Sequence, residues 1–264
     1  MAASTESKII EIMENQTVIS ISELASRLSR SEMTVRRNLD ILQDHGFIIR
    51  KRGYAVLQKK GQATNFHHEQ VERTEEKSAI AKAALHFIRP GSSVCFDSGT
   101  TTQKLVESFP DKNIQLSVIT PSLTIAETLS TYPEVQVYMP EGCLHHSNLT
   151  LLFSSEEVLR NLRADIAFMA CRSFKPPLGT FENTPTMRLT KHALSKIADQ
   201  TVLLLDYSKW NNSALCSTIA LHDIDVIITD NKAPQEEVLK CADTGKKVIV
   251  VDPSSERNTK YYNF

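Results

Sequence analysis

Six consecutive residues that could bind a ligand directly follow the apolar segment 93–96: Asp97, Ser98, Gly99, Thr100, Thr101 and Thr102. The glycine lets the backbone approach a ligand closely, and the first N–H groups of a helix that starts here would attract an anion. The threonine hydroxyls add hydrogen-bond donors. The pattern therefore predicts a cradle for a phosphate group. A strand-to-helix turn without a ligand would use the same residues, and the G-K-[ST] ending of a Walker loop is missing.

Polar side chains follow two later apolar segments in the same way. Thr120 and Ser122 come after one of them, and Asp206 and Lys209 come after another. Asp206 could hold sugar hydroxyls and Lys209 could neutralise a phosphate, although an Asp–Lys pair at such a place is more often a surface pair of little energy. In open parallel sheets, ligands bind beyond the carboxyl ends of the strands, which is where these side chains would lie.

A second region of chemical interest is the basic N-terminal end. Residues 1–60 contain ten lysines and arginines against seven acids, whereas the whole chain has a formal net charge of −1. Such asymmetry between the parts of a chain hints at a segment that binds a polyanion. Basic surface segments are common, so charge alone does not identify a polyanion-binding segment, and the predicted helices and strands of residues 1–60 have to support it.

Three short helices are predicted at the basic end. Apolar residues recur with helical spacing in 7–15, in 20–28 and in 35–42, and Ser31 is a good N-cap for the third helix. Two helices joined by a tight turn are typical of a helix-turn-helix, whose second helix enters the major groove of DNA. The predicted DNA-contacting residues near the start of that helix are Ser31, Glu32, Met33, Thr34, Arg36 and Arg37.

The side chains of this region suit the chemistry of DNA. Arginine can pair with guanine edges or phosphates, and the methyl group of Thr34 can touch that of thymine. The apolar runs within 47–56 flank a basic tip formed by Arg50, Lys51 and Arg52, which predicts a β-hairpin whose tip reaches phosphate. A helix-turn-helix with such a hairpin is the winged variant. The alternative is a small helical domain that contacts another protein.

The remainder of the chain predicts a second, larger domain of the α/β class. We expect a DNA-binding domain over 1–57, a polar linker over 58–74 and the α/β domain over 75–264. Short β-rich runs alternate with helical segments, which indicates a mostly parallel sheet covered on both faces. The expected strands are 93–96, 116–119, 135–139, 166–170, 202–205, 226–229 and 247–251. The expected helices are 77–88, 101–108, 122–130, 155–163, 186–198 and 234–240.

The third predicted helix carries a motif that is specific enough to suggest a family. Residues 34–39 read TVRRNL, and Gly46-Phe47 and Arg50 follow. The motif resembles the N-terminal signature of the DeoR family of bacterial transcription regulators, which usually reads T-V/I-R-R/K-D-L. Asn38 stands where that family has an acid, and 52–54 stand where it has a Gly-Gly pair. The resemblance covers residues 7–56 and implies a winged helix-turn-helix.

Motifs in the larger domain resemble the effector domain of the same family, which has a fold like that of ribose-5-phosphate isomerase. The family patterns D-S-G-T-T, T-N-S, G-G and D-x-S-K match the chain at 97–101, 120–122, Gly142 and 206–209. The resemblance implies that a phosphorylated sugar or a related metabolite binds there. The departures suggest altered sugar contacts or a lost ligand: Pro121 for Asn, Cys143 and Ser154 for Gly, Thr186 for Glu, and Thr190 for Lys, with Lys191 as its possible substitute.

A sugar-phosphate isomerase is the alternative interpretation of this domain. Isomerisation needs a general base that moves a proton between carbons. The isomerase family places paired aspartates in its later motifs, whereas residues 163–173 contain one acid, Asp165. No His, Cys and Asp set has the spacing of a metal site, and His67-His68 or His145-His146 alone is insufficient. We therefore expect a sensor, without catalytic residues, a metal or a cofactor.

The sequence also argues against a membrane-spanning, secreted or disulfide-bonded protein. No apolar run approaches the ~20 residues of a membrane span, and the N-terminus lacks the pattern of a secretory signal. The five cysteines are scattered without a C-x-x-C pair, as in a reduced, cytoplasmic protein. We expect a repressor that binds double-stranded operator DNA as a homo-oligomer, a dimer or tetramer, because helix-turn-helix proteins commonly bind paired half-sites. Its operator affinity would respond to the phosphorylated effector.

Overall fold

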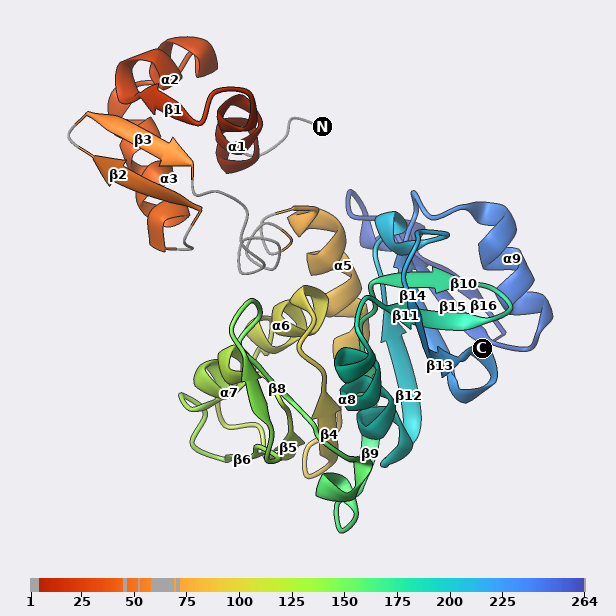
Figure 1. The fold of residues 1–264 in the computed structure, drawn as a ribbon. Coiled ribbons are helices and arrows are strands. Elements are labelled where there is room, and N and C mark those ends of the chain that lie inside the picture. Colours follow the sequence, from red (N-terminus) through yellow and green to blue (C-terminus); the bar gives the residue numbers. More distant parts are fainter. Residues whose placement is uncertain (1–4, 45–46, 52, 58–68, 70–71, 264) are drawn as a thin grey trace. The chain divides into compact units, whose positions relative to one another are not determined.

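The computed structural model of the protein describes residues 5–44, 47–51, 53–57, 69 and 72–263. The chain divides into two compact units, Met1–Arg73 and Thr74–Phe264 (Figure 1). Each unit has buried hydrophobic residues of its own, so each has its own core. The smaller unit contains the helix-turn-helix and the larger unit is of the α/β class, as the sequence predicts.

In its described residues, the N-terminal unit has three helices and a small antiparallel sheet. Their bounds are α1 (Thr5–Asn15), β1 (Val18–Ser20), α2 (Ile21–Leu28), α3 (Glu32–Asp44), β2 (Ile48–Lys51) and β3 (Tyr54–Leu57), with the strands in the order β1-β3-β2. The hydroxyl of Ser20 accepts a hydrogen bond from the backbone N of Glu23 (3.1 Å) and so caps α2. Ser31 does the same for the backbone N of Thr34 (3.2 Å), which confirms its predicted role at the start of α3.

The core of this unit explains why the polar residues of α3 face solvent. Val35, Leu39 and Leu42 of α3 are completely buried together with residues of α1 and α2. The other faces of α3 therefore point outward. The predicted hairpin is confirmed as β2 and β3, whereas the third strand, β1, was not predicted. Arg52, a predicted wing-tip cation, and Gly46 of the family motif lie outside the described residues.

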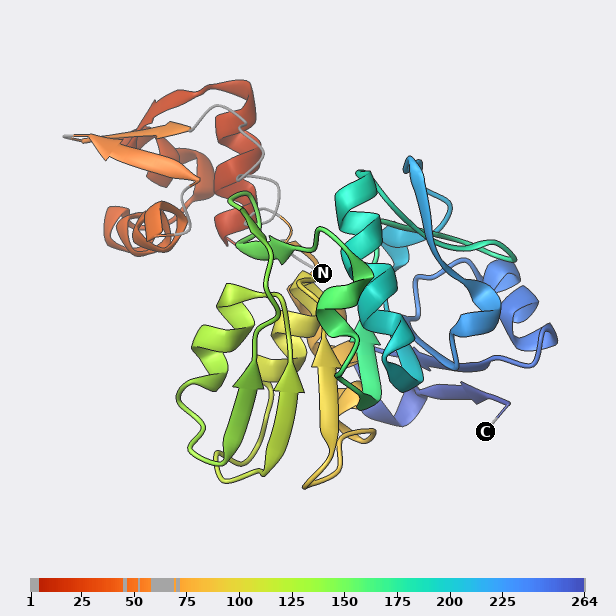
Figure 2. The ribbon, with the colours of Figure 1, turned by 60° about the horizontal axis from the view of Figure 1, so that its bottom comes forward.

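The C-terminal unit is built around a sheet that has eight strands in the described residues (Figure 1). In spatial order they are β16 (Lys260–Tyr262), β15 (Lys247–Val251), β14 (Val226–Asp230), β12 (Ala198–Leu204), β9 (Ala164–Met169), β4 (Ser93–Phe96), β5 (Leu116–Ile119) and β6 (Val135–Tyr138). Neighbouring strands are parallel except β15 and β16. The parallel arrows of β4, β5 and β6 lie side by side in Figure 2.

Helices and shorter elements surround this sheet. The helices are α5 (Thr74–Leu85), α6 (Thr100–Glu107), α7 (Leu123–Leu129), α8 (Pro185–Lys196) and α9 (Gln235–Asp243). The short strands are β7 (Cys143–His145), β8 (Thr150–Leu152), β10 (Ser173–Lys175), β11 (Gly179–Glu182) and β13 (Cys216–Ala220). The short 3-10 turns are η1 (Glu156–Leu159), η2 (Tyr207–Lys209), η3 (Leu221–Asp223) and η4 (Glu256–Asn258). Strands β10, β11 and β13 form a second sheet, and β7 pairs with β8.

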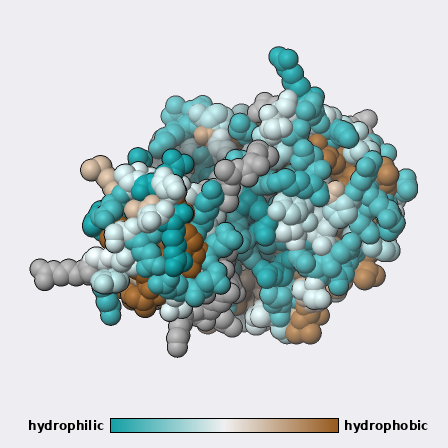
Figure 3. Space-filling view, turned by 90° about the horizontal axis from the view of Figure 1, so that it is seen from above, coloured by the Kyte–Doolittle hydropathy of each residue, from teal (hydrophilic) through white to brown (hydrophobic). Residues whose placement is uncertain are grey.

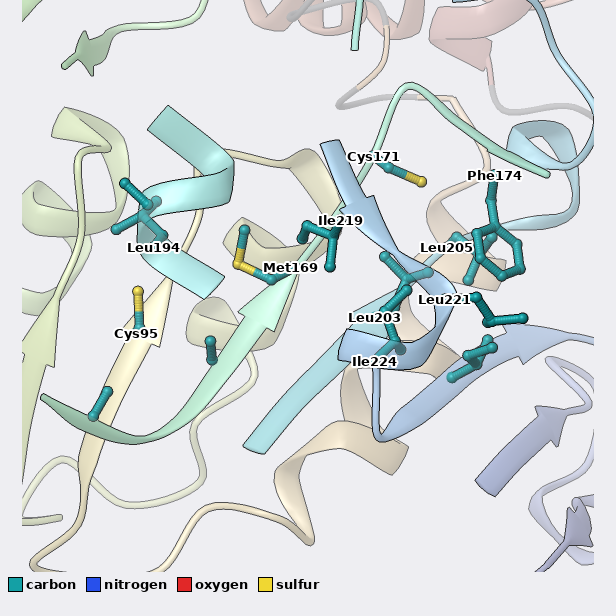
Figure 4. Close-up of a cluster of buried hydrophobic side chains, with 14 of the residues drawn as sticks. Cys95, Met169, Cys171, Phe174, Leu194, Leu203, Leu205, Ile219, Leu221 and Ile224 are labelled. Atoms are coloured by element: carbon teal, nitrogen blue, oxygen red, sulfur yellow. The ribbon is translucent and has the colours of Figure 1, made fainter. Parts of the chain in front are cut away.

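Successive residues of the central strands face opposite sides of the large sheet. Val94 and Phe96 of β4 pack with residues of α5, α6 and α7, whereas Cys95 packs with residues of α8 and α9. In β9, Phe168 and Met169 divide between the two faces in the same way. Figure 4 shows the second of these cores, where strand residues meet those of α8 and the smaller sheet. The three layers confirm the prediction of a mostly parallel sheet covered on both faces.

One predicted helix was wrong. The segment 155–163 contains only the turn η1, which Ser155 caps by accepting a hydrogen bond from the backbone N of Glu157 (3.2 Å). The backbone N of Leu162 then bonds to the carbonyl of Leu159 (2.9 Å), three residues back, and β9 begins at Ala164. The apolar residues of this segment have helical spacing, but the early start of the strand leaves no room for an α-helix.

The surface of the described residues is mainly polar. In the face seen in Figure 3, hydrophilic residues predominate and the hydrophobic ones form small, separate groups. In the described part of the chain, no helix has both the length and the apolar character needed to cross a membrane.

Candidate functional sites

The strand order reverses at the centre of the large sheet. From β4 the chain adds β5 and β6 on one side, and it then returns to place β9 and β12 on the other side. The carboxyl ends of β4 and β9 therefore flank a topological switch point, which is where open α/β sheets bind ligands. Asp97 directly follows β4, and Ala170 directly follows β9. The predicted anion cradle thus begins at this switch point.

Asp97 is completely buried and points into the structure. Its Oδ1 atom accepts hydrogen bonds from the backbone N of Gly99 and the hydroxyl of Thr102, both at 2.8 Å. Its Oδ2 atom accepts the backbone N of Ala170 (2.8 Å) and lies 3.1 Å from Nζ of Lys191. Both oxygens are therefore occupied, and the carboxylate shapes the turn around it rather than reaching toward a ligand.

Lys191 of α8 is held by a second acid that the sequence analysis missed. Its Nζ atom lies 2.8 Å from Oε1 of Glu182, in β11, and donates to the carbonyl of Ala170 (2.7 Å). Burial by itself lowers the pKa of Lys191, but the carboxylates of Asp97 and Glu182 outweigh it and the pKa is raised. Glu182 also accepts the backbone N of Arg172 (3.1 Å). The only hint in the sequence is an acid placed within a strand-like run.

Cys171 lies close to the switch point, and the charged groups nearby influence the pKa of its thiol. Its thiol is buried, and burial raises its pKa to about 12, so the thiol is neutral and unreactive. The smaller influences on that pKa come from Lys191, Glu182, Lys209 and Asp97. Lys209, which the sequence assigns to the effector site, is thus in electrostatic range of the switch point.

The start of α6 differs from its neighbours in how it is capped. Gly99 occupies the N-cap position and supplies no side-chain hydrogen bond, whereas Ser122 and Thr184 cap α7 and α8. A Cβ atom on Gly99 would lie 2.4 Å from that of Ala170, so only glycine fits between the two segments. The start of α6 is therefore left with backbone N–H groups that no side chain of the N-cap satisfies.

The hydroxyls beside this helix start fall into two groups. Thr102 donates to Asp97 and is committed to the fold. Ser98, Thr100 and Thr101 make no side-chain hydrogen bond within the described part of the chain, although little of each residue is exposed. These three hydroxyls and the N–H groups of the first turn are the donors available to an anion at this place.

Thr120 and Ser122 maintain the next turn along the sheet. The hydroxyl of Thr120 accepts the backbone N of Ser122 (3.2 Å), and the hydroxyl of Ser122 accepts the backbone N of Ile125 (3.3 Å). Both residues are buried, so in this structure they act in turn and cap roles. The hydroxyl of Thr190, where the family has a lysine, is also used within the fold. It donates a hydrogen bond to the carbonyl of Thr186 (3.0 Å) and accepts one from the backbone N of Phe153 (2.9 Å).

Asp206 lies at the end of β12 and belongs to a second buried group of acids. Its Oδ1 atom accepts the backbone N of Ser208 (2.9 Å), and the neighbouring Asp230 accepts the backbone N of Tyr207 (2.7 Å). Burial raises the pKa of Asp230 to about 6, and the charge of Asp206 adds to this effect although backbone N–H donors oppose it.

Within the N-terminal unit, the predicted DNA-contacting residues of α3 share an exposed surface. Several of their polar groups are nevertheless bonded to one another. The hydroxyl groups of Ser31 and Thr34 are 2.9 Å apart, Asn38 donates to the carbonyl of Thr34 (2.7 Å), and Arg36 lies 3.1 Å from Glu32. In contrast, Met33 is 81% exposed, and Arg37 is exposed without an ion pair to any described residue.

The wing contains one cation that is tied to the recognition helix. The guanidinium of Arg50 forms a salt bridge with Asp40 of α3, and its backbone N donates to Oε1 of Gln43 (2.9 Å). Lys51, next in the chain, is exposed. Arg50 therefore fixes the hairpin against α3 in this structure, while Lys51 is the described wing cation that faces solvent.

The described residues contain no group of three or more His, Cys, Asp or Glu side chains arranged to hold a metal ion. A groove of about 720 Å³ lies between α5 and the sheet edge at β15 and β16, and its walls include Ala83, Phe87 and Val251. None of its lining residues belongs to the predicted effector site.

A winged helix-turn-helix joined to an α/β unit with a ligand-type switch point defines a DNA-binding transcription regulator with a sensor domain. Residues 6–61 match the family model described as "DeoR-like helix-turn-helix domain", and residues 72–231 match "DeoR C terminal sensor domain". The chain belongs to the DeoR family of transcription regulators.

Whole-chain relatives agree with this assignment. The uncharacterized HTH-type transcriptional regulator YulB of Bacillus subtilis is 30% identical over 259 residues, which are 97% of this chain and 99% of that protein. The glycerol-3-phosphate regulon repressor of Escherichia coli is 25% identical over 227 residues, 86% and 90% of the two chains. Among solved structures, ribose 5 phosphate isomerase A of Neisseria gonorrhoeae has a TM-score of 0.39 and 13% identity, over 51% of this chain and 52% of that one.

Proposed function

We propose that the protein is a repressor whose affinity for operator DNA is controlled by a phosphorylated sugar or a related metabolite. The observation that carries this proposal is the start of α6, where an uncapped glycine and three hydroxyls without partners among the described residues lie at the switch point of the sheet. The N–H groups of a helix start favour a phosphate, and hydroxyls complete its hydrogen bonds. The name of the glycerol-3-phosphate relative is in line with this choice of ligand.

The charges around the cradle also influence which ligand is favoured. Lys191 is shared by two carboxylates, so this buried group has one more negative than positive charge when all three are ionised. Lys191 is thus engaged within the fold, and we assign the phosphate-neutralising role to Lys209, whose charge also acts on Cys171 at the switch point. The phosphate would lie at the first turn of α6, and the polar part of the metabolite would extend toward the hydroxyls beside it.

The regulator would act on double-stranded DNA in the cytoplasm as a homo-oligomer, a dimer or tetramer. Each N-terminal unit would place α3 in a major groove, and paired units would bind paired half-sites. A coupling free energy of about 1–3 kcal/mol between effector and DNA would change operator affinity roughly 5- to 150-fold. The three-residue group of Asp97, Lys191 and Glu182 is used within the fold, which supports a sensor rather than an isomerase.

The test is a thermal-shift screen of sugar phosphates on the full chain, followed by DNA binding with each hit. Thr101→Val should remove one hydroxyl with little change of volume and weaken the response, and Thr101→Asp should abolish it by adding a negative charge to the cradle. Gln235→Asp is the control, because it adds the same charge to the exposed start of α9.

Two results would overturn the proposal. A normal response of Thr101→Asp to a hit would place the ligand elsewhere. Conversion of a hit to an isomer, without any effect on DNA binding, would support the isomerase alternative.

A further inference from the structure

The start of the recognition helix exposes an apolar side chain. Met33, the second residue of α3, is 81% exposed, whereas Val35 and Leu39 of the same helix are completely buried. Met33 therefore contributes nothing to the core of its unit. A residue of this kind is free to contact another molecule, and methionine is well suited because its thioether chain is flexible and polarisable.

The polar neighbours of Met33 are largely occupied within the helix. The hydroxyl of Thr34 is bonded to that of Ser31 (2.9 Å), and the carbonyl of Thr34 accepts from Asn38 (2.7 Å). This network holds Thr34 in the capping turn, so its methyl group is a poorer candidate for contact with a base. Glu32 is paired with Arg36.

Met33 shares its helix face with a cation. Residues four apart lie on the same face of a helix, so Arg37 is the neighbour of Met33 toward the C-terminus. Arg37 is exposed and has no ion pair with a described residue. The face thus offers one adaptable apolar group followed by one guanidinium, and both point outward from the core side formed by Val35 and Leu39.

The chemistry of the major groove identifies the group that Met33 fits. Base edges there present hydrogen-bond donors and acceptors, and the one apolar group among them is the C5-methyl of thymine. We propose that Met33 reads a thymine methyl in the operator, with Arg37 contacting the adjacent guanine edge or phosphate. This inference deepens the proposed function, since it rests on DNA binding through α3, and it moves the methyl-reading role from Thr34 to Met33.

The expected effect follows from the area of one methyl group. Burial of one methyl group is worth ~0.8 kcal/mol. Because a change of about 1.4 kcal/mol alters the affinity tenfold, loss of the methyl contact should weaken binding about fourfold. Replacing thymine by deoxyuridine removes this methyl and leaves the hydrogen-bonding groups of the base unchanged. The substitution therefore isolates the contact that the proposal names.

The experiment uses the full chain at one fixed salt concentration, because affinity for DNA depends strongly on salt. Duplexes are first selected from a random pool, and each thymine of the selected site is then replaced singly by deoxyuridine. At least one replacement should weaken the wild type about fourfold. Met33→Ala should bind the thymine and uracil duplexes equally, and Met33→Leu should keep the preference.

Ile41→Ala is the matched control, since Ile41 is an exposed apolar residue of the same helix, farther from its start, and this variant should keep the preference. An unchanged preference in Met33→Ala, or a wild type indifferent to every replacement, would overturn the inference while leaving DNA binding intact. Failure of the wild type to select any duplex would instead overturn the proposed function and the inference with it. Because Met33 is exposed, circular dichroism should show all variants folded.

Discussion

Replacing Lys191 by methionine would remove the one cation between two buried carboxylates. In the wild type, Nζ lies 2.8 Å from Glu182 and 3.1 Å from Asp97 and donates to the carbonyl of Ala170. Methionine keeps much of the volume but none of these contacts. Breaking one side of a buried ion pair costs about 3–5 kcal/mol, because the remaining charge is left without a partner.

The assay is urea unfolding followed by tryptophan fluorescence. The chain contains a single tryptophan, Trp210, which is buried against Phe174 in the C-terminal unit, so the signal reports on that unit alone. Lys196→Met is the matched control, because Lys196 lies on the same helix and pairs with Asp223 at the surface (3.0 Å). An exposed pair is worth about 0.2–1 kcal/mol.

The reasoning is refuted if Lys191→Met costs no more than Lys196→Met at pH 8. Addition of Glu182→Gln to Lys191→Met should restore part of the stability, since it leaves a single buried charge in place of two.

Three further results are expected. Gly99→Ala should destabilise the C-terminal unit by about 1–3 kcal/mol and blunt the effector response, because its Cβ would collide with that of Ala170, and urea unfolding checks this. Lys51→Ala should reduce the salt dependence of DNA binding by about one phosphate contact, whereas Arg50→Ala should mainly lower the stability of the winged unit; equal slopes for both would contradict the salt bridge to α3. Because the pKa of Asp230 is raised from 3.8 to about 6, chiefly by burial, its contribution to stability should fall by up to about 3 kcal/mol as the pH rises through that window, and carboxyl-carbon NMR should place its midpoint near 6.

Seven strands of the large sheet were predictable because they are short apolar runs between turn residues, whereas its edge strand β16 was not predicted. The strands 93–96, 116–119 and 247–251 have the same bounds in the structure as in the prediction. The short strands β7, β8, β10 and β11 were not predicted, since three or four residues of mixed polarity carry no periodic signal. Their pairing depends on contacts that only the folded chain provides.

The candidate effector site was predictable in place but not in detail. The sequence locates the loop after β4, because glycine and hydroxyl residues between a strand and a helix are a local pattern. It cannot reveal that Lys191 meets an acid on each side, since Asp97 is far away in the chain. It also cannot separate Thr102, which serves the fold, from Thr101, whose hydroxyl stays available. These distinctions arise from tertiary contacts.

The three hydrogen bonds and the ion pair of the Asp97 carboxylate have a mechanical consequence. Gly99 and Thr102 belong to the start of α6, on one face of the sheet, whereas Lys191 belongs to α8, on the other. The backbone of Ala170, at the end of β9, completes the group. A displacement of the first turn of α6 would therefore act through this one carboxylate on α8, in the helix layer on the other face of the sheet.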